Sequence, residues 1–175
     1  MRVDEMEAGR ELDALVAEKV MGWQRWEPED DGDDAYPAHW VNADGTWTGW
    51  SAEPWPEDTY NIYGECRFGD APGLMSPWGV WNPLEDIVAA WLVVGAFIAD
   101  PAERWTVRLL YAPDCQMYEA AFWRYLDKKT GEAVDIRARS VYTYQHVTGR
   151  YWHKSAATAI CCAALKAVGV EEVSP

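Results

Sequence analysis

The segment from residue 24 to residue 81 limits the choice of fold more than any other feature of this sequence. It covers about a third of the 175-residue chain, and no helical or strand-like period of apolar residues runs through it. Pro, Gly, Asn and Asp recur in it, and residues 27–34 form an acidic run. An irregular stretch of this length is uncommon inside a compact domain. We therefore expect an insertion within a single domain, whose regular elements come from the sequence on either side.

Tryptophan is concentrated in this insertion, and six of the 12 tryptophans of the chain lie between Pro37 and Asn82. One interpretation is a small core of its own, because each Trp side chain buries on the order of 200 Å² where regular structure is scarce. The other is a stacking platform for a planar ligand such as a nucleobase. The two roles can be divided among different rings. The candidate ligand-binding tryptophans are Trp47, Trp50, Trp55, Trp78 and Trp81.

Three segments outside the insertion have the pattern of helices. Residues 7–23 place apolar side chains at helical spacing and stop near Gly22. Residues 155–169 predict a small-residue helix with Ser155 or Thr158 near its start and Gly169 after its end. Residues 82–100 begin with Asn82 as the expected N-cap. This middle helix is apolar nearly all round, so both of its sides should be covered. We expect a sheet on one side and the insertion or a second protomer on the other, which predicts a homo-oligomer.

The remaining regular segments have the pattern of antiparallel strands. Residues 104–113 predict one strand, and residues 117–141 predict a hairpin that turns at "DKKTGE". Residues 141–147 predict a further strand, which Gly149 is expected to end. Inside the insertion, Asp44-Gly45 predicts a short hairpin, residues 59–69 one strand and "DAPG" (70–73) a turn. Helices on three to four antiparallel strands give an α+β fold.

The charge is unevenly distributed along the chain, whose net charge is −14. Residues 1–99 hold 20 acidic and 5 basic side chains, whereas residues 100–175 hold 9 acidic and 10 basic ones. Overall acidity argues against general nucleic-acid binding through phosphates. It leaves room for a small anionic ligand that a few Arg or Lys side chains hold in the C-terminal half.

Several classes of protein are disfavoured by the sequence. The longest apolar run, residues 87–99, is shorter than the roughly 20 residues that a bilayer-spanning helix needs, and the charged N-terminus does not resemble a signal peptide. We therefore expect no membrane partner and a location in the cytoplasm. The four cysteines and three histidines show no metal-ligand spacing, so no metal or cofactor is predicted, and Cys161 and Cys162 are expected to be small buried side chains.

Four stretches of the sequence resemble the phage ABA-sandwich domain family. They are "AGRELDALVAEKVMGW", "DIVAAWLVV", "FWRYLDKKTGE" and "AATAICCAALKAV", and they occur in the order of that family. The resemblance implies an α-β-α sandwich and a phage origin. It implies no catalytic positions, because the shared pattern consists of packing residues. The chain departs from the family pattern at residues 24–81 and 140–154, so function is argued from these two segments.

The second of these segments, "SVYTYQHVTGRYWHK", contains aromatic side chains and basic side chains just before the last predicted helix. Its aromatic residues alternate along a strand, and its basic residues precede a helix N-terminus, which favours anions. One interpretation is a grip for a phosphate and a base; the other is an edge strand with ordinary surface aromatics. The candidate ligand-binding residues here are Tyr142, Tyr144, His146, Arg150, Tyr151, Trp152 and Lys154.

The sequence contains no glycine-rich phosphate loop, nucleophile elbow or HExxH motif, so no catalytic residue and no enzyme activity are predicted. We interpret the chain as a phage protein that binds a small nucleotide-like molecule between the insertion and residues 140–154. The phage setting suggests that the ligand is a nucleotide-derived host immune signal, which the protein sequesters in the host cytoplasm. The alternatives are an acidic inhibitor or DNA mimic that binds a host protein, and a virion or assembly component.

Overall fold

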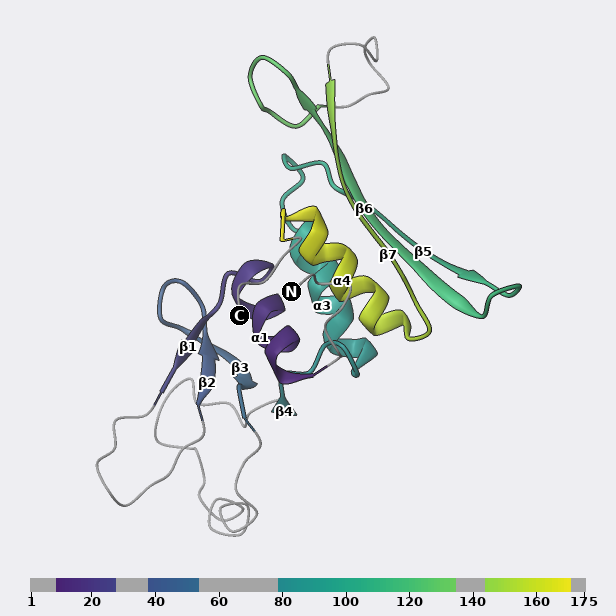
Figure 1. The fold of residues 1–175 in the computed structure, drawn as a ribbon. Coiled ribbons are helices and arrows are strands. Elements are labelled where there is room, and N and C mark those ends of the chain that lie inside the picture. Colours follow the sequence, from purple (N-terminus) through teal and green to yellow (C-terminus); the bar gives the residue numbers. More distant parts are fainter. Residues whose placement is uncertain (1–8, 28–37, 54–78, 135–143, 171–175) are drawn as a thin grey trace, which may run out of the picture. The chain divides into compact units, whose positions relative to one another are not determined.

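The computed structural model describes residues 9–27, 38–53, 79–134 and 144–170. The chain divides into two compact units (Figure 1). Unit 1 comprises residues 1–21 and 82–175, and unit 2 comprises residues 22–81.

The described residues of unit 1 form three helices and one antiparallel sheet. Its helices are α1 (Arg10–Lys19), α3 (Ile87–Ile98) and α4 (Ala156–Ala167). Its strands are β5 (Thr106–Ala112), β6 (Met117–Asp127) and β7 (Tyr144–His153), and β6 lies in the middle. The predicted α+β class, with helices on an antiparallel sheet and a long insertion between the first two helices, is confirmed.

Helix α4 is the centre of unit 1. It packs on β6 and β7 on one side, and α1 and α3 contact it elsewhere (Figure 1). Nearly all of its residues are buried, including Cys161 and Cys162, as expected from the sequence. Small side chains let the backbone of α4 come close to the sheet. Helix α3 packs along α4, and its Phe97 ring reaches Phe122 of β6 at 4.5 Å between ring centroids.

Gly149 lies where α4 and the sheet approach most closely. A Cβ atom at this position would lie 2.0 Å from the Ala163 carbonyl oxygen and 2.3 Å from the Ala167 amide nitrogen. Only glycine therefore fits, and β7 continues through it to His153. The prediction that Gly149 ends the strand is wrong, because the glycine makes room for a helix instead of breaking the extended backbone.

Helix α3 starts later than the sequence predicts. Its N-cap is Asp86, whose carboxylate accepts a hydrogen bond from the Val88 N–H at 2.8 Å, while the Asn82 carbonyl closes a separate turn. The turn is held by Leu84, whose N–H donates to the Asp13 carboxylate at 3.2 Å and whose carbonyl accepts from the Thr158 hydroxyl at 3.0 Å. Asn82 is therefore not the cap. Ser155, in contrast, caps α4 as predicted.

Asp13 is a buried carboxyl group that joins α1 to the turn before α3. Burial raises its pKa to about 6, because the carboxylate has lost its hydration. The Leu84 N–H acts in the opposite direction, and the nearby charge of Glu85 raises the pKa further. Burial also raises the pKa of Cys161, whose thiol donates to the Pro83 carbonyl at 3.4 Å.

Unit 2 contains a small sheet in the order β1-β2-β3-β4. The strands are β1 (Gln24–Trp26), β2 (His39–Val41), β3 (Trp47–Ser51) and β4 (Gly79–Val80); β4 runs parallel to β3, and the other pairs are antiparallel. The β2–β3 hairpin confirms the predicted turn at Asp44-Gly45. Gly45 has φ 82°, and the Asp44 carboxylate accepts from the Thr46 N–H and hydroxyl, which lowers the pKa of Asp44. The strand predicted at 59–69, the turn predicted at 70–73 and most of the acidic run lie outside the described residues.

Candidate functional site

Two indoles of unit 2 enclose a side chain of the protein itself: Trp47, a predicted candidate, and Trp26, which was not predicted, both contact the His39 ring. Trp26 and Trp47 lie on either side of His39, with ring centroids 4.4 Å and 3.6 Å from the imidazole. All three residues project from the same face of the sheet, and His39 is buried while both indoles are exposed. Trp47 therefore offers a solvent-facing ring, whereas the space between the two indoles is occupied.

Other tryptophans of unit 2 form a core. Trp81 is buried, and its ring meets those of Trp23 and Trp50 edge-to-face at centroid distances of 4.6 Å and 5.4 Å. Trp40 is also buried, and Trp50 is half-buried. The expectation that Trp81 contacts a ligand is wrong, because its ring is enclosed by its neighbours. Trp55 and Trp78 lie outside the described residues.

Alternation along β7 separates the candidates of the second segment. Arg150 and Trp152 point to the face of the sheet opposite α4, and we call this face of β5, β6 and β7 the open face. Tyr151 points to the helix side, where the Lys166 ammonium lies 4.9 Å from its ring centroid. Tyr151 therefore does not join Arg150 and Trp152, contrary to expectation. Lys154 follows the strand and is exposed.

Three further candidates are described only in part or not at all. Tyr144 and His146 belong to β7, where their backbones lie opposite Asp127 and Tyr125 of β6, and their side chains are outside the described set. Tyr142 lies outside the described residues altogether. The first turn of α4 offers little to an anion, because Ser155 caps it and the Thr158 hydroxyl is bonded to Leu84.

The open face carries a buried carboxylate between two arginines. Glu119 of β6 is the acceptor: Arg108 Nη2 donates to its Oε2 at 3.0 Å, and Arg150 Nε donates to its Oε1. Register explains the arrangement, because Arg108, Ala121 and Arg150 lie directly opposite one another across the three strands, one row away from Glu119. The small Ala121 side chain leaves space for both guanidinium groups to reach the same carboxylate.

The burial of this cluster differs sharply among its members. The Glu119 side chain is 3% exposed, whereas those of Arg108 and Arg150 are 45% and 57% exposed. A buried carboxylate needs such partners, because an unpaired charge in the interior is costly. Each guanidinium has five N–H donors and directs part of its fork to Glu119 while much of its surface faces solvent. Glu119 therefore acts as an anchor that fixes two cations on an exposed surface.

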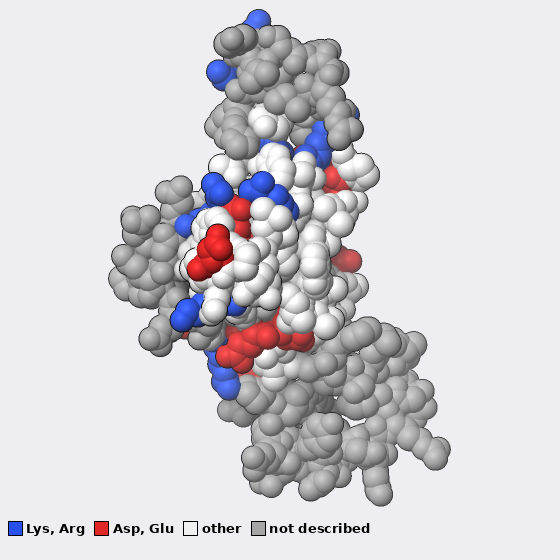
Figure 2. Space-filling view, turned by 90° about the vertical axis from the view of Figure 1, so that its right-hand side faces the viewer, with Lys and Arg blue, Asp and Glu red and all other residues white. Residues whose placement is uncertain are grey.

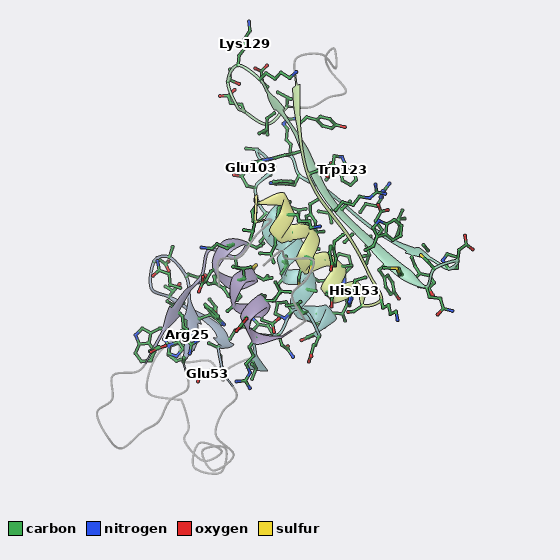
Figure 3. All side chains as sticks on the ribbon, in the orientation of Figure 1. Arg25, Glu53, Glu103, Trp123, Lys129 and His153 are labelled. Carbon is green, nitrogen blue, oxygen red and sulfur yellow. The ribbon has the colours of Figure 1, made fainter. Side chains whose placement is uncertain are left out.

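Two indoles flank the arginines on the open face. The Arg108 guanidinium lies 5.9 Å from the Trp123 ring centroid, and the Arg150 guanidinium lies 5.8 Å from that of Trp152. Trp123 is labelled in Figure 3, on the side of the sheet away from the helices. Figure 2, seen from the right-hand side of Figure 1, shows acidic and basic side chains in small groups on a surface that is mostly neither. The open face thus combines anchored positive charge with flat aromatic surface.

Sequence analysis missed three members of this cluster, namely Arg108, Glu119 and Trp123. The sequence offered a weak signal, since Glu119 is the single acid within "MYEAAFWRYL". Its partners come from two other strands and are defined only by the register.

Within the described ranges, no group of three or more His, Cys, Asp or Glu side chains is arranged to hold a metal ion. None of the helices in this part of the chain combines the length and apolarity needed to cross a membrane. No protein-family model, curated protein or solved structure matches the chain.

Proposed function

We propose that the protein is a non-enzymatic binding protein that retains a small nucleotide-like anion on the open face of the β5–β6–β7 sheet. The observation that carries the proposal is the pair of exposed guanidinium groups fixed by buried Glu119 and flanked by Trp123 and Trp152. Guanidinium groups bind phosphate oxygens through charge-assisted hydrogen bonds, and indoles stack on bases. Nucleotides contain both of these chemical groups.

The charge of the cluster favours one kind of phosphate. Arg108 and Arg150 bring two positive charges and Glu119 one negative charge, so the three together carry a net charge of +1. A phosphodiester carries a single negative charge and matches this balance, whereas a terminal phosphate carries close to two. We therefore infer a cyclic or bridged nucleotide as the ligand class.

The fixed positions of Arg108 and Arg150 support binding of a ligand without its chemical conversion. The ion pairs to Glu119 hold both guanidinium groups in place before a ligand arrives, which reduces the entropy lost on binding. A protein that binds a signalling nucleotide without converting it lowers the free concentration of that nucleotide. Sequestration of a host immune signal in the host cytoplasm is the role we assign, and this part of the proposal rests on the resemblance to phage proteins alone.

The test is a binding measurement on the full chain with cyclic AMP, cyclic di-AMP and cyclic di-GMP, by isothermal titration calorimetry and native mass spectrometry. Adenosine and inorganic phosphate serve as partial ligands that lack the phosphate and the base, respectively. We expect one of the cyclic nucleotides to bind and to be recovered unchanged, and both partial ligands to bind far more weakly. Failure of all three cyclic nucleotides to bind would overturn the proposal.

Two pairs of variants test the location of the site. Trp152→Ala should weaken binding by about 5- to 150-fold, which corresponds to the roughly 1–3 kcal/mol of one base stacked on an aromatic ring. Trp91→Ala, which removes an exposed indole from α3, is its control. Arg108→Gln should also weaken binding, whereas Arg10→Gln at the start of α1 should not. Equal affinities within each pair would exclude the open face as the site.

A further inference from the structure

Helix α3 has one buried and one exposed face, and both are apolar. Ala89, Ala90, Val93, Val94 and Phe97 are buried within unit 1. The opposite face carries exposed Val88 (66%), Trp91 (50%) and Leu92 (42%), and the whole helix contains no charged residue. Contiguous apolar surface of this kind marks an interaction site in a soluble domain.

Large and small residues are arranged along the exposed face in a self-complementary order. Val88, Trp91 and Leu92 are large and lie in the first half of the helix. Gly95, Ala96 and Ala99 follow at the same helical spacing, and a Cβ atom built on Gly95 would have no atom within 4 Å. Exposed Ile98 (57%) follows Trp91 by seven residues and borders these small residues on one side. The first half of this face is thus a ridge, and the second half is a hollow with Ile98 at its edge.

We propose that this face binds the α3 helix of a second copy of the chain in an antiparallel, two-fold symmetric pair. One register places these three large residues over small ones: Val88 opposite the partner's Ala99, Trp91 opposite the partner's Ala96, and Leu92 opposite the partner's Gly95. Two-fold symmetry then repeats the same three pairs on the other side of the axis. A second copy fits this surface because the ridge of each chain fills the hollow of the other.

Area and charge also favour a second copy. Ile87 and Ile98, which are 41% and 57% exposed, extend the apolar face beyond the three paired residues. A specific interface buries on the order of 1,000 Å² or more in total, so the whole exposed face of α3 is expected to take part. The uncharged helix offers a charged partner no ion pairs. It does let two copies of an acidic chain meet at a surface where neither carries a charge.

The dimer surface and the candidate ligand site lie on opposite sides of the sheet of unit 1. Helix α3 packs with α4 on the helix side, whereas Arg108, Arg150 and Trp152 belong to the open face. Each copy in the dimer therefore keeps its own ligand site, and dimer formation does not depend on the proposed function.

Sedimentation velocity of the full chain, over a concentration series around the micromolar range, tests the association. We expect a reversible dimer for the unmodified chain. Leu92→Glu should shift the midpoint of association by at least about tenfold, because it buries a charge on each side of the interface. Gly95→Leu should do the same by filling the hollow, and the monomer should stay folded because the space beside Gly95 is open. A chain that stays monomeric throughout the series would overturn the proposal.

Disulfide trapping tests the register. In a Cys66→Ser, Cys115→Ser background, chains carrying Val88→Cys and chains carrying Ala99→Cys are oxidised separately and as a mixture. Only the mixture should yield a cross-linked dimer in high amount, because residues 88 and 99 lie at opposite ends of the helix and meet only across an antiparallel pair. Efficient cross-linking of either variant alone would contradict the antiparallel arrangement.

Two tryptophan variants separate this proposal from the proposed function. Trp91→Ala should abolish the dimer and leave ligand binding unchanged, whereas Trp152→Ala should weaken ligand binding and leave the dimer unchanged.

Discussion

The two units bury their residues by different means. Unit 1 is built on close approach of backbones, with α4 lying on Gly149 and presenting mainly Ala and Cys to its surroundings. Unit 2 has short strands and depends on large rings, namely buried Trp40 and Trp81 and the Trp26–His39–Trp47 stack. A large ring covers much area with one residue and leaves its outer face exposed, whereas close backbone approach tolerates no added atom. The two units should therefore respond differently to substitution.

The largest effect is expected where backbones are closest. Gly149→Val should destabilise unit 1 by about 5 kcal/mol or more, because the new side chain would overlap backbone atoms of Ala163 and Ala167. Denaturant unfolding measures this change. Gly9→Ala is the control and should change the free energy of unfolding by less than about 1 kcal/mol, since a Cβ atom there would have no atom within 4 Å. If Gly149→Val unfolded at the same denaturant concentration as the unmodified chain, the close packing of α4 on β7 would be disproved.

The next effect concerns the ring-based core of unit 2. Trp40→Ala should cost about 3–5 kcal/mol, because it removes a fully buried indole. Hydrogen exchange measured by mass spectrometry should show faster exchange in β2 and β3, with α4 and β6 protected as before. Equal loss of protection in α4 would show that the two units unfold together.

A pH effect distinguishes the buried carboxyl group of unit 1. Because the pKa of Asp13 is about 6 in the folded protein and near 3.8 when unfolded, the folded state holds the proton more tightly. Its contribution to stability is present below about pH 4 and is lost as the pH rises to 6, at a cost of up to about 3 kcal/mol. Asp13→Asn should remove this loss and still accept the Leu84 N–H. The free energy of unfolding is measured at pH 4 and at pH 7 for the unmodified chain and for the variant. If it changed by the same amount between the two pH values in both proteins, the assignment to Asp13 would be refuted.

Asp44 of unit 2 has a lowered pKa and acts in the opposite sense, because its contribution to stability is lost only in acid.

The smallest effect is expected at the exposed ends of the ring stack. Trp47→Ala should cost about 1–2 kcal/mol, because it removes one stacked neighbour of His39 and leaves Trp26 in place. The His39 imidazole should become accessible to diethyl pyrocarbonate, while it resists modification in the unmodified chain. Modification of His39 at equal rates in both proteins would contradict the stacked arrangement.

Local signals in the sequence predicted much of the fold. Ser155 caps α4 through a hydrogen bond to a residue only three positions away, so the cap does not depend on where the helix packs. Asp44-Gly45 forms a turn because glycine readily adopts the positive φ that the turn requires. The role of Gly149 was predicted wrongly, because the sequence alone does not distinguish a glycine that ends a strand from one that lets a helix pack closely on the strand. Asn82 misled because its turn is held by Asp13 and Thr158, which are distant in the sequence.

The candidate site was harder to predict, for the same reason. Arg150 and Trp152 were recognised as a cation and a ring just before the last helix, but not as members of a strand, because Gly149 was expected to end it. Arg108 and Glu119 join them only through the pairing of β5, β6 and β7, which no local pattern specifies. The Trp–His–Trp stack likewise depends on which residues of β1, β2 and β3 face each other.

Helix α1, near the start of the chain, packs against α4, near its end, and this order has a consequence for biosynthesis. Unit 2 is a continuous stretch, so it can fold as soon as it leaves the ribosome. Helix α1 is synthesised before α4, so during translation its apolar side chains lack the helix that they pack against. Unit 1 therefore completes its fold only after the residues of unit 2 have been synthesised.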